Sequence, residues 1–453
     1  MNRSFFISYL CMEFRQNERL SKLRIQNFTI MLTLKYITEN TDDTIKRLAK
    51  KHFDGKEIIA QVVDLDQVRK NTQTQLDKVS AEMNALSKAI GTLFQQGKYD
   101  EANEAKAKTA ELKDTIKLLG DRLNEIEAEL QNLLVQIPNL PHESVPEGKL
   151  PENNVIEKEG GKIPELGNEA LPHWDLAKKY DLIDFETGVK ITGAGFPVYK
   201  GRGARLQRAL INFFLDNAQD AGYLEVQTPY LVNAESGYGT GNLPDKEGQM
   251  YHCTTDDLYL IPTAEVPVTN IYRDVILNEK DLPIKNTAYS ACFRREAGSY
   301  GKDVRGLNRL HQFDKVEIVR IDTPEHSYQS LAEMVDYVQS LVEKLELPYR
   351  ILRLCGGDMS FTAALTFDFE VYSAAQERWL EVSSVSNFES FQANRLKCRF
   401  KGTDKKTQLC HTLNGSALAL PRILAALLEN NQTPEGIRVP KALVPYAGFE
   451  VIS

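Results

Sequence analysis

The chain has 453 residues, a formal net charge of −8 and 26% charged residues. It is longer than one ordinary domain, so we expect two folded units. The acidic balance excludes the overall basic signature of many nucleic-acid-binding proteins, and any contact with RNA must therefore come from local patches. No apolar run reaches the roughly 18 residues that a membrane span needs. The composition is that of a soluble globular protein.

An apolar stretch near the start of the chain, Phe5–Met12, raises the question of a targeting segment. It is too short for a signal peptide, and no small-residue cleavage site follows it. An amphipathic transit peptide fits slightly better, but Glu13 and Glu18 argue against one. The preferred hypothesis is that Met31 is the functional start and that the extension formed by residues 1–30 is dispensable.

From residue 76 onward, apolar residues recur at alternating spacings of three and four, which is the heptad pattern of a coiled coil. The two series are Leu76, Val79, Met83, Leu86, Ile90 and Leu93, and then Ala105, Thr109, Leu112, Ile116, Leu119, Leu123, Ile126, Leu130 and Leu133. Because only residues 96–99 separate them, we predict an antiparallel hairpin of two helices, each about 60 Å long at 1.5 Å per residue. Periodicity alone favours dimerisation or a spacer role, and the near balance of lysines and acids gives RNA binding no support.

Four prolines follow the second series: Pro138, Pro141, Pro146 and Pro151. Proline cannot continue a helix and favours extended chain, so this stretch is predicted to be a linker. The sequence beyond it mixes a helical pattern over 202–221, ended by Gly222, with period-two runs and a final helical pattern over about 416–429. That order predicts an α+β domain with a largely antiparallel sheet.

Two strand-like runs, Thr287–Glu296 and Arg309–Val319, flank a loop that is rich in glycine and basic residues. The loop contains Gly298, Gly301, Lys302, Arg305 and Gly306. Period two puts Ser290, Cys292, Arg294 and Glu296 on one face of the first run, and Arg309, His311, Phe313, Lys315 and Glu317 on one face of the second. Guanidinium groups for phosphate and a ring for base stacking would make a nucleotide platform. A sheet surface crossed by ion pairs is an equally good interpretation.

Arg422 is the only charged residue in the apolar run 412–428. We therefore expect it to be buried, and a buried guanidinium needs an anion, which is either a carboxylate or a bound phosphate. Glu381, in the strand-like run 380–388, is a candidate partner or a candidate ligand for a metal ion beside the same phosphate. The sequence contains neither a Walker loop nor a GxGxxG fingerprint, so the common nucleotide-binding folds lose support.

The six cysteines are scattered, with no CxxC pair and no regular spacing. They are Cys11, Cys253, Cys292, Cys355, Cys398 and Cys410. This usage predicts free thiols in a reducing compartment, and no zinc site is expected.

Several long stretches resemble the signature segments of the seryl-tRNA synthetase family, which belongs to class II. They are FRREAGSYGKDVRGLNRLHQFDKVE (293–317), PTAEVP (262–267), EVSSVSNFESFQANR (381–395), HTLNGSALALPRILAALLEN (411–430) and HWDLAKKYDLIDFETGVKITGAGF (173–196). Together with the predicted arm, the resemblance covers nearly everything from Met31 to the end. These matches are long, ordered and highly specific.

The resemblance implies a serine–tRNA ligase of α+β class, in which an N-terminal helical hairpin precedes a catalytic domain with an antiparallel sheet flanked by helices. Residues 31–137 would form a tRNA-binding domain with a coiled-coil arm, 138–170 a linker and 171–453 the class II catalytic domain. The segment from Arg202 to Pro229 is similar to motif 1, which implies a homodimer. The substrates would be L-serine, ATP and tRNA(Ser), with Mg²⁺ as the cofactor and the cytoplasm as the location. Whether tRNA(Sec) is also a substrate is left open, and no membrane partner is expected.

Carried over position by position, the resemblance implies that Arg294, Arg422 and Glu381 are catalytic. The residues that would bind ATP are Arg294, Arg295, Glu296, Arg309, Phe313, Glu381, Val382, Ser383, Ser384 and Arg422. Arg294 would hold the α-phosphate and the serine carboxylate, Phe313 would stack on the base, and Arg422 would bind the γ-phosphate. Glu381 and Ser384 would bind Mg²⁺.

For serine, the resemblance implies a separate set of residues at the same site. They are Thr263, Ala264, Glu265, Arg294, Glu317, Asn414 and Ser416. Two departures from the family pattern concern Arg295, where many relatives have serine, and Pro421, which we expect in the first turn of its helix or at a kink. The competing interpretations are a ligase that loads a carrier rather than tRNA, and a coiled-coil adaptor without enzymatic activity.

Overall fold

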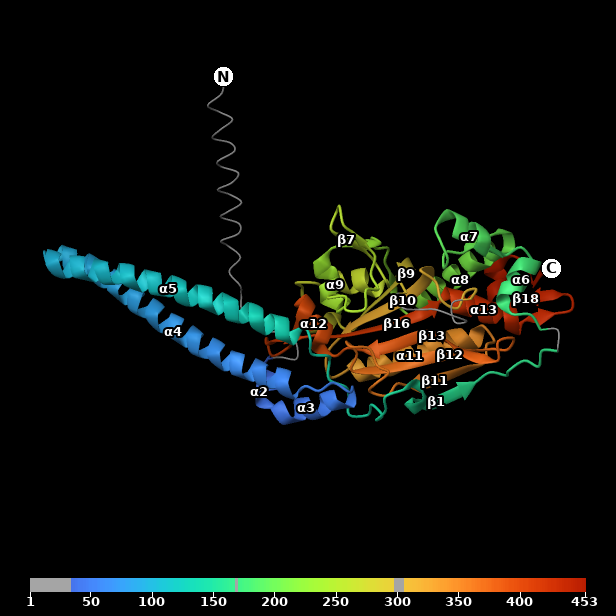
Figure 1. Cartoon of the computed structure of the whole chain (residues 1–453), viewed down its shortest axis with the longest axis horizontal. Helices are drawn as coiled ribbons and strands as arrows, with labels where there is room; N and C mark the ends of the chain where they lie inside the picture. The colour runs from blue at the N-terminus through green and yellow to red at the C-terminus, as the bar shows by residue number, and fades with distance from the viewer. Residues whose placement is uncertain (1–33, 168–169, 297–304) are drawn as a thin grey trace, which may run out of the picture.

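The computed structural model describes residues 34–167, 170–296 and 305–453. They form a helical arm and a larger α+β unit built on a sheet (Figure 1). The hypothesis about Met31 and residues 1–30 lies outside the described residues. So do Cys11 and part of the predicted glycine-rich loop, namely Gly298, Gly301 and Lys302.

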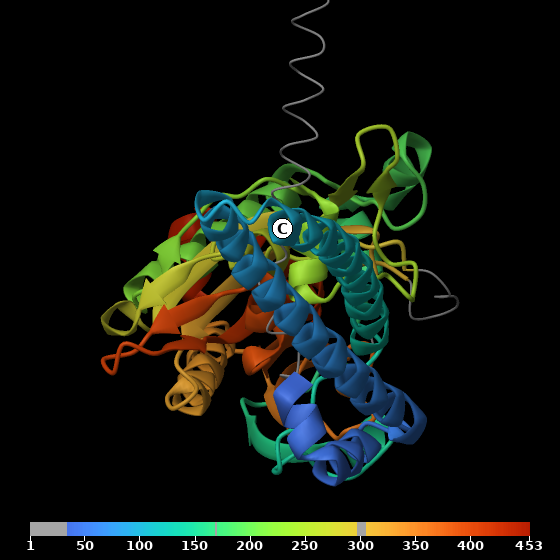
Figure 2. The same ribbon diagram turned by 90° about the vertical axis from the view of Figure 1, so that its left-hand side faces the viewer.

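The arm is a hairpin of two long helices that follow two short ones. Its described helices are α2 (Leu34–Glu39), α3 (Thr41–Lys50), α4 (Lys56–Gln95) and α5 (Tyr99–Leu134). α4 and α5 pack against each other and project from the rest of the molecule (Figures 1 and 2). With 40 residues, α4 spans about 60 Å at 1.5 Å per residue. The predicted antiparallel hairpin is confirmed, and its turn spans residues 96–98, one residue fewer than the predicted 96–99.

The base of the arm extends beyond the predicted heptads, because α4 begins at Lys56 rather than near Leu76. There Ile59 and Val62 of α4 pack in one cluster with Ile126 and Leu130 of α5. α2 and α3 also contact α4 at this end. On α4 the predicted heptad series starts only beyond this cluster, whereas on α5 the series continues into it through Ile126 and Leu130.

The larger unit contains, within the described ranges, an eight-stranded sheet in the order β1-β11-β12-β13-β16-β10-β9-β4. The strands are β1 (Val155–Gly160), β4 (Leu224–Glu225), β9 (Ile284–Phe293), β10 (Gln312–Asp322), β11 (Tyr349–Arg353), β12 (Leu365–Ser373), β13 (Arg378–Asn387) and β16 (His411–Ala419). Neighbouring strands run antiparallel, except that β4 pairs with β9 in parallel. The predicted α+β class with a largely antiparallel sheet is confirmed.

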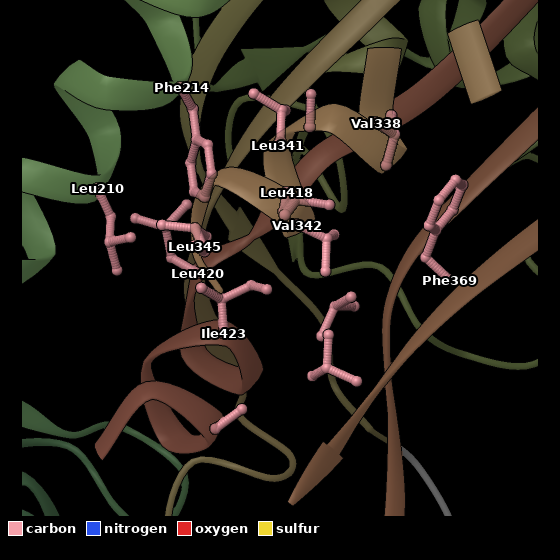
Figure 3. Packing of buried hydrophobic residues seen from close by; sticks show 14 of the residues in the cluster. Leu210, Phe214, Val338, Leu341, Val342, Leu345, Phe369, Leu418, Leu420 and Ile423 are labelled. Carbon is pink, nitrogen blue, oxygen red and sulfur yellow. The ribbon is translucent and has the colours of Figure 1, made fainter. Parts of the chain in front are cut away.

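Helices α8 (Gly201–Asp220), α11 (Ser327–Lys344) and α13 (Leu420–Asn430) pack on one face of this sheet and enclose the main core. Figure 3 shows their buried side chains meeting there, with Leu210 and Phe214 from α8, Val338, Leu341 and Val342 from α11, and Leu420 and Ile423 from α13. The helix predicted over 202–221 is confirmed as α8, and Gly222 follows it with φ +81°. The opposite face of the sheet is left for the site.

Shorter elements surround the large sheet. The remaining helices are α6 (His173–Lys179), α7 (Phe185–Ile191), α9 (Ala234–Thr240), α10 (Glu265–Asn270), α12 (Ser390–Leu396), α14 (Val444–Ala447) and the 3-10 turns Pro151–Asn153, Glu279–Asp281 and Lys441–Leu443. The remaining strands are β2 (Ile183–Asp184), β3 (Val198–Tyr199), β5 (Leu231–Val232), β6 (His252–Cys253), β7 (Leu258–Leu260), β8 (Ile276–Asn278), β14 (Arg399–Lys401), β15 (Thr407–Leu409), β17 (Gln432–Thr433), β18 (Gly436–Arg438) and β19 (Val451–Ile452).

The final helix begins later than predicted. The pattern suggested a start near Ser416, but β16 continues to Ala419 and α13 begins at Leu420. Pro421 lies in the first turn of α13, where its missing N–H has no partner to lose. The expectation that this proline sits in a first turn is confirmed, and the predicted start at 416 is wrong because proline marks the true beginning.

The proline-rich stretch after α5 contains a strand. Within residues 138–170, β1 pairs with β11 and forms one edge of the large sheet. The chain thus joins the sheet before residue 171, and the domain boundaries stay a prediction. None of the described helices is both long and apolar enough to cross a bilayer.

Candidate active site

A cavity of about 680 Å³ lies over β10, β13 and β16, on the side of the sheet away from the main core. Side chains from these strands form its floor, while the chain beyond β9, the segment 307–310 and the start of α13 form one wall. The loops 241–247 and 360–362 form another wall. Segments that are far apart in the sequence therefore meet at one hollow.

The two predicted charged strands are β9 and β10, and they pair in antiparallel register as neighbours. Phe313 lies opposite Cys292 and Lys315 lies opposite Ser290, so these side chains share one face, as period two predicts. β9 is shorter than the predicted run, because it ends at Phe293. Arg294 lies just beyond the strand, where its backbone N donates to the carbonyl of His311 at 2.9 Å.

Arg294 reaches into the cavity from the end of β9. Its Cζ lies 5.3 Å from the centroid of the Phe313 ring, and its Nε donates to the carbonyl of Pro262 at 3.4 Å. Near the same wall, Arg309 forms an ion pair with Glu296. A guanidinium beside an aromatic ring is the arrangement that the nucleotide-platform interpretation requires. The ion pair shows that part of the surface is also salt-bridged, as the other interpretation suggested.

Arg422 lines the same cavity, although we expected it to be buried. Its side chain is 32% exposed, so the expectation is wrong. Arg422 sits in the first turn of α13, at the cavity edge, and the apolar residues around it in sequence pack on the other sides of the helix. Its Nε donates to the carbonyl of Asn308 at 3.0 Å, and one terminal nitrogen donates to the carbonyl of Glu381 at 2.8 Å. The Glu381 carboxylate lies 3.8 Å away, so Glu381 is a neighbour of Arg422.

A β-bulge brings Glu381 and Ser384 to one face of β13. Phe369 pairs with Ser383, but Glu370 pairs with Glu381, so the strand carries one extra residue between them. Without the bulge, residues three apart would point to opposite faces. Asp368 lies opposite Ser384 on the neighbouring strand. Burial and the charge of Glu381 raise the pKa of the Asp368 carboxyl well above its usual value. The bulge thus gathers acidic and hydroxyl oxygens beside Arg422.

The other end of the cavity is a small polar pocket. On its floor, Lys315 Nζ lies 2.6 Å from Glu317 Oε2 and donates to Thr263 Oγ1 at 2.8 Å. Asn414 Nδ2 donates to Glu317 Oε1 at 3.0 Å from β16, and Ser416 lies opposite Glu317 in the strand register. Lys315, Thr263, Asn414 and Glu317 thus hold one another in place, so this part of the pocket is preorganised.

Glu265, at the start of α10, adds a second carboxyl to this pocket. Gln392 Nε2 donates to its Oε1 at 2.7 Å, and Thr412 in turn donates to Gln392 Oε1 at 2.7 Å. Burial, followed by the charge of Glu317, raises the pKa of Glu265 to about 7. A carboxyl in this condition gains from a cationic ligand, because an ammonium group would offset both the burial and the neighbouring negative charge.

The cavity brings together most of the residues that the resemblance implied. Those that line it are Thr263, Glu265, Arg294, Glu296, Arg309, Phe313, Glu317, Glu381, Val382, Ser383, Ser384, Asn414, Ser416 and Arg422. Ala264 is buried in a neighbouring hydrophobic cluster and Arg295 is exposed, and neither is among the lining residues. The side chain of Val382 belongs to the main core.

Three residues of the site were not assigned from the sequence. Lys315 was placed on the correct strand face but received no role, although its position two residues from both Phe313 and Glu317 was a usable signal. Gln392 and Asp368 were missed, because each acts through a partner on another strand or helix. Such pairings are visible only once the sheet register is known.

The described cysteines, Cys253, Cys292, Cys355, Cys398 and Cys410, are free thiols. Across the residues that the structure describes, no three or more histidine, cysteine or acidic side chains gather in a way that could hold a metal ion.

Comparison with known proteins gives a consistent result. A family model for the seryl-tRNA synthetase N-terminal domain matches residues 31–141, and one for the class II tRNA synthetase core domain (G, H, P, S and T) matches residues 251–431. The chain is 50% identical to the serine–tRNA ligase of Salinibacter ruber, over 92% of this chain and 98% of the relative. The corresponding ligase of Akkermansia muciniphila is 46% identical over 93% of this chain and 99% of the relative.

Solved structures agree. The seryl-tRNA synthetase of Pyrococcus horikoshii, complexed with ATP, superposes with a TM-score of 0.87 at 33% identity, covering 93% of this chain and 99% of that one. The cytoplasmic serine–tRNA ligase of Naegleria fowleri, in complex with AMP, gives a TM-score of 0.81 at 27% identity, covering 91% and 96%. The chain therefore belongs to the seryl-tRNA synthetase family of class II aminoacyl-tRNA synthetases.

Proposed function

We propose that this chain joins L-serine to the 3′ end of tRNA(Ser) at the cavity described above. In the first step the serine carboxylate attacks the α-phosphate of ATP, which gives seryl-adenylate and pyrophosphate. In the second step a terminal ribose hydroxyl of the tRNA attacks the adenylate and releases AMP. The observation that supports this function most strongly is the convergence of Arg294 and Arg422 on one cavity, with the Phe313 ring beside one guanidinium and a polar pocket beyond.

We assign the nucleotide to the end of the cavity that holds Arg294, Phe313 and Arg422. Arg294 would bind the α-phosphate and the serine carboxylate, which is supported by its place beside the Phe313 ring in the same cavity as Glu265 and Glu317. Phe313 offers its face to the base, and Arg422 takes the γ-phosphate. Glu296 and Arg309 form the outer rim near the adenine, and Arg295, which is exposed, contributes positive charge from outside the cavity. Ser383 and Val382 line the wall beneath.

We assign serine to the polar pocket. The carboxyl of Glu265, assisted by Thr263 and the backbone at Ala264, receives the ammonium group, which is supported by the raised pKa of Glu265. Glu317, Asn414 and Ser416 surround the place for the small hydroxyl side chain. A buried polar pocket of this kind strongly penalises an analogue that lacks the hydroxyl, because its own groups would be left unpaired.

The residues near Arg422 suit a magnesium ion that accompanies ATP. The β-bulge puts Glu381, Ser384 and Asp368 on one face, and their carboxylate and hydroxyl oxygens are ligands that Mg²⁺ prefers. Burial, followed by the charge of Glu381, raises the pKa of Asp368, and a nearby cation would offset both effects. We propose Glu381 and Ser384 as the ligands. A bound Mg²⁺ would neutralise charge on the triphosphate.

Catalysis in this proposal needs no protein nucleophile. Arg294 and Arg422 hold the triphosphate in line with the serine carboxylate and stabilise the charge that develops on the α-phosphate, and Glu381 would hold a Mg²⁺ ion that adds positive charge there. The fixed hydrogen bonds of Lys315 and Asn414 keep the pocket in shape before substrates arrive. Positioning and electrostatic stabilisation therefore account for the rate enhancement.

We propose that residues 31–137 form the tRNA-binding domain, 138–170 the linker and 171–453 the catalytic domain. The length of the arm suits a long acceptor such as tRNA, and tRNA(Sec) is a second acceptor to test.

A homodimer through the motif 1 region is supported by Leu224, which is 66% exposed on the edge strand β4 beside α8. Sedimentation should show a dimer for the wild type and a monomer for Leu224→Asp. The free thiols suit a reducing compartment, and we propose the cytoplasm.

The experiment that tests the function is pyrophosphate exchange with each of the twenty amino acids, followed by charging of tRNA(Ser). Serine alone should support exchange, and the same preparation should form seryl-tRNA. Absence of serine-dependent exchange would remove the ligase proposal. Exchange without charging would instead indicate a ligase that loads a carrier. Charging of tRNA(Sec) in parallel would decide the second acceptor.

A further inference from the structure

A buried ring of hydrogen bonds ties three distant segments together behind the nucleotide end of the cavity. Its centre is His173, at the start of α6, beside Glu429 near the end of α13, and both side chains are 0% exposed. Nδ1 of His173 lies 2.6 Å from Glu429 Oε1. Nε2 accepts a hydrogen bond of 2.8 Å from the backbone N–H of Leu307. Helices α6 and α13 contact each other, and they lie close together in Figure 1.

The partners of His173 fix where its proton lies. A backbone N–H can only donate, so Nε2 carries no proton and acts as the acceptor for Leu307. Burial acts to raise the pKa of Glu429, but hydrogen bonds from His173 and Ser373 outweigh burial and lower it. The Glu429 carboxylate therefore accepts the proton of Nδ1. The ring is a neutral imidazole in one tautomer, with both nitrogens in use.

The segment that His173 holds also holds Arg422. Leu307 is followed by Asn308, whose carbonyl accepts the Nε hydrogen bond of Arg422 at 3.0 Å. The Asn308 side chain donates to Gln376 Oε1 at 2.9 Å, and Gln376 donates to Glu429 Oε1 at 2.9 Å. Arg422 and Glu429 lie two turns apart on α13. The hydrogen bonds therefore close a ring from His173 through Asn308 to the guanidinium and back along the helix.

A glycine allows the close approach. Gly306 has φ +65°, and a Cβ built on it would stand 2.2 Å from His173 Nε2. Next to it, Arg305 places its Cζ 4.5 Å from the centroid of the Trp174 ring. Two successive residues of α6 thus hold the segment by which the glycine-rich loop returns to β10. Gly306 and Arg305 on one side and His173 and Trp174 on the other therefore form this contact.

We propose that His173 is a positioning residue for nucleotide binding, which anchors the returning end of the loop through Leu307 and so holds the Asn308 carbonyl against Arg422. The inference rests on the proposed function in one respect, the assignment of Arg422 to a phosphate of ATP. His173 itself lies outside the cavity lining. Its effect on the reaction reaches the substrate only through the guanidinium that it helps to fix.

Two variants distinguish the loss of the hydrogen-bond acceptor from the loss of the volume of the imidazole ring. His173→Leu keeps the volume but removes the acceptor for Leu307, while His173→Gln offers a carbonyl oxygen near the position of Nε2. In serine-dependent exchange, the leucine variant should raise KM for ATP by about tenfold, the usual scale for one lost hydrogen bond to a charged group, and leave KM for serine unchanged. The glutamine variant should recover most of the loss.

The matched control is His411→Leu, which removes another imidazole, partly buried, and its 2.8 Å contact with Ser327 Oγ on α11. It should leave KM for ATP unchanged. If His173→Leu only lowers the folded fraction, with both KM values unchanged, or if the control raises KM for ATP equally, the residue is structural and the proposal is overturned. Unchanged kinetics in a folded leucine variant would overturn it as well.

Calorimetric ATP binding tests the route through Arg422. Substitution of His173 by leucine should cost far less affinity in an Arg422→Ala background than in the wild type, because the group it positions is gone. Equal costs in both backgrounds would contradict the proposal.

Nitrogen NMR of the wild type should find the His173 proton on Nδ1, and a proton on Nε2 would contradict the ring of hydrogen bonds. If serine-dependent exchange fails in the wild type, the proposed function fails, but binding and NMR still decide the role of His173.

Discussion

Lys315 and Glu317 form an ion pair on the floor of the cavity, with 2.6 Å between Nζ and Oε2 and side chains that are only 6% and 1% exposed. A buried pair of this kind contributes little net stability, but removal of one partner leaves an uncompensated charge. The pair also fixes Glu317 in place for a ligand, since Asn414 holds its other oxygen. Stability and substrate binding can therefore be separated by changing one partner or both.

Lys315→Met should destabilise the protein by about 3 kcal/mol, because Glu317 is left buried without its cation. The double variant Lys315→Met with Glu317→Gln should regain much of that stability, since neither side chain then carries a charge. Both variants should lose serine-dependent exchange. Chemical unfolding together with exchange assays measures the two effects. Equal destabilisation of the single and double variants would show that packing, and not the unpaired charge, sets the cost.

Glu265 makes serine binding depend on pH. Its pKa is raised to about 7 by burial and by the charge of Glu317, so the carboxyl becomes neutral as the pH falls through 7 and no longer attracts an ammonium group. KM for serine should therefore rise as the pH is lowered from 8 to 6, while KM for ATP changes little. Serine binding near pH 7 should also release protons. Calorimetry in buffers of different ionisation enthalpy detects that release, and a pH-independent KM for serine would contradict the assignment.

The same shift predicts a gain in stability for Glu265→Gln. A carboxyl whose folded pKa exceeds its unfolded value binds protons more tightly when folded, so the wild type loses stability as the pH rises from about 4.5 to 7. At pH 8 the variant should be more stable by about 1–3 kcal/mol, and the gain should vanish toward pH 4.5. Thermal unfolding across this range checks it. Asp184→Asn is the control, because the hydrogen bonds from Thr187 lower the pKa of Asp184, so the sign of its effect is opposite.

The arm should be required for charging and not for adenylate formation. Deletion of residues 75–95 and 99–119 removes three heptads from each helix. It keeps the native turn and the register in which α4 packs against α5. Because the base cluster with Ile59 and Ile126 stays intact, the shortened hairpin should still fold. Serine-dependent exchange should stay within about twofold, while kcat/KM for tRNA should fall by more than about tenfold. Equal loss of both activities would mean that the arm is structural.

The sequence was a good guide wherever one periodicity governs an element. The hairpin, α8 and the face shared by Phe313, Lys315 and Glu317 follow from spacings of three to four or of two. It was a poor guide where a partner elsewhere decides. Arg422 looked buried because its neighbours are apolar, yet the start of a helix at the cavity edge leaves one side open.

The bulge in β13 is the clearest case of information that periodicity cannot supply. A regular strand would send Glu381 and Ser384 to opposite faces, so only the resemblance to a known family put them together before the register was known. Asp368 escaped notice for the same reason, since its relation to Ser384 is a pairing between strands. The sequence shows which residue types are present, but only the register of the strands shows that Glu381, Ser384 and Asp368 lie together.

Lys51, at the end of α3, provides a last test, because it connects the arm to the cavity wall. Its Nζ donates to the carbonyls of Ser360 at 2.8 Å, Phe361 at 3.3 Å and Ala363 at 2.6 Å, and the first two residues line the cavity. Lys51→Met leaves these carbonyls without their donor and should cost about 1–3 kcal/mol of stability. It should also loosen the wall nearest the arm, so that charging of tRNA falls more than serine-dependent exchange.

Lys50 is the matched control for this prediction. It is the last residue of α3 and also donates to backbone carbonyls, those of Glu143 at 2.9 Å and Val145 at 3.3 Å, but neither of these two residues lines the cavity. Lys50→Met should therefore lower stability without changing the ratio of charging to exchange. Lys51→Arg, which retains a cationic donor, should restore part of the ratio. If Lys50→Met and Lys51→Met alter the ratio equally, the lysines secure only the attachment of the arm, and the cavity wall does not depend on either of them.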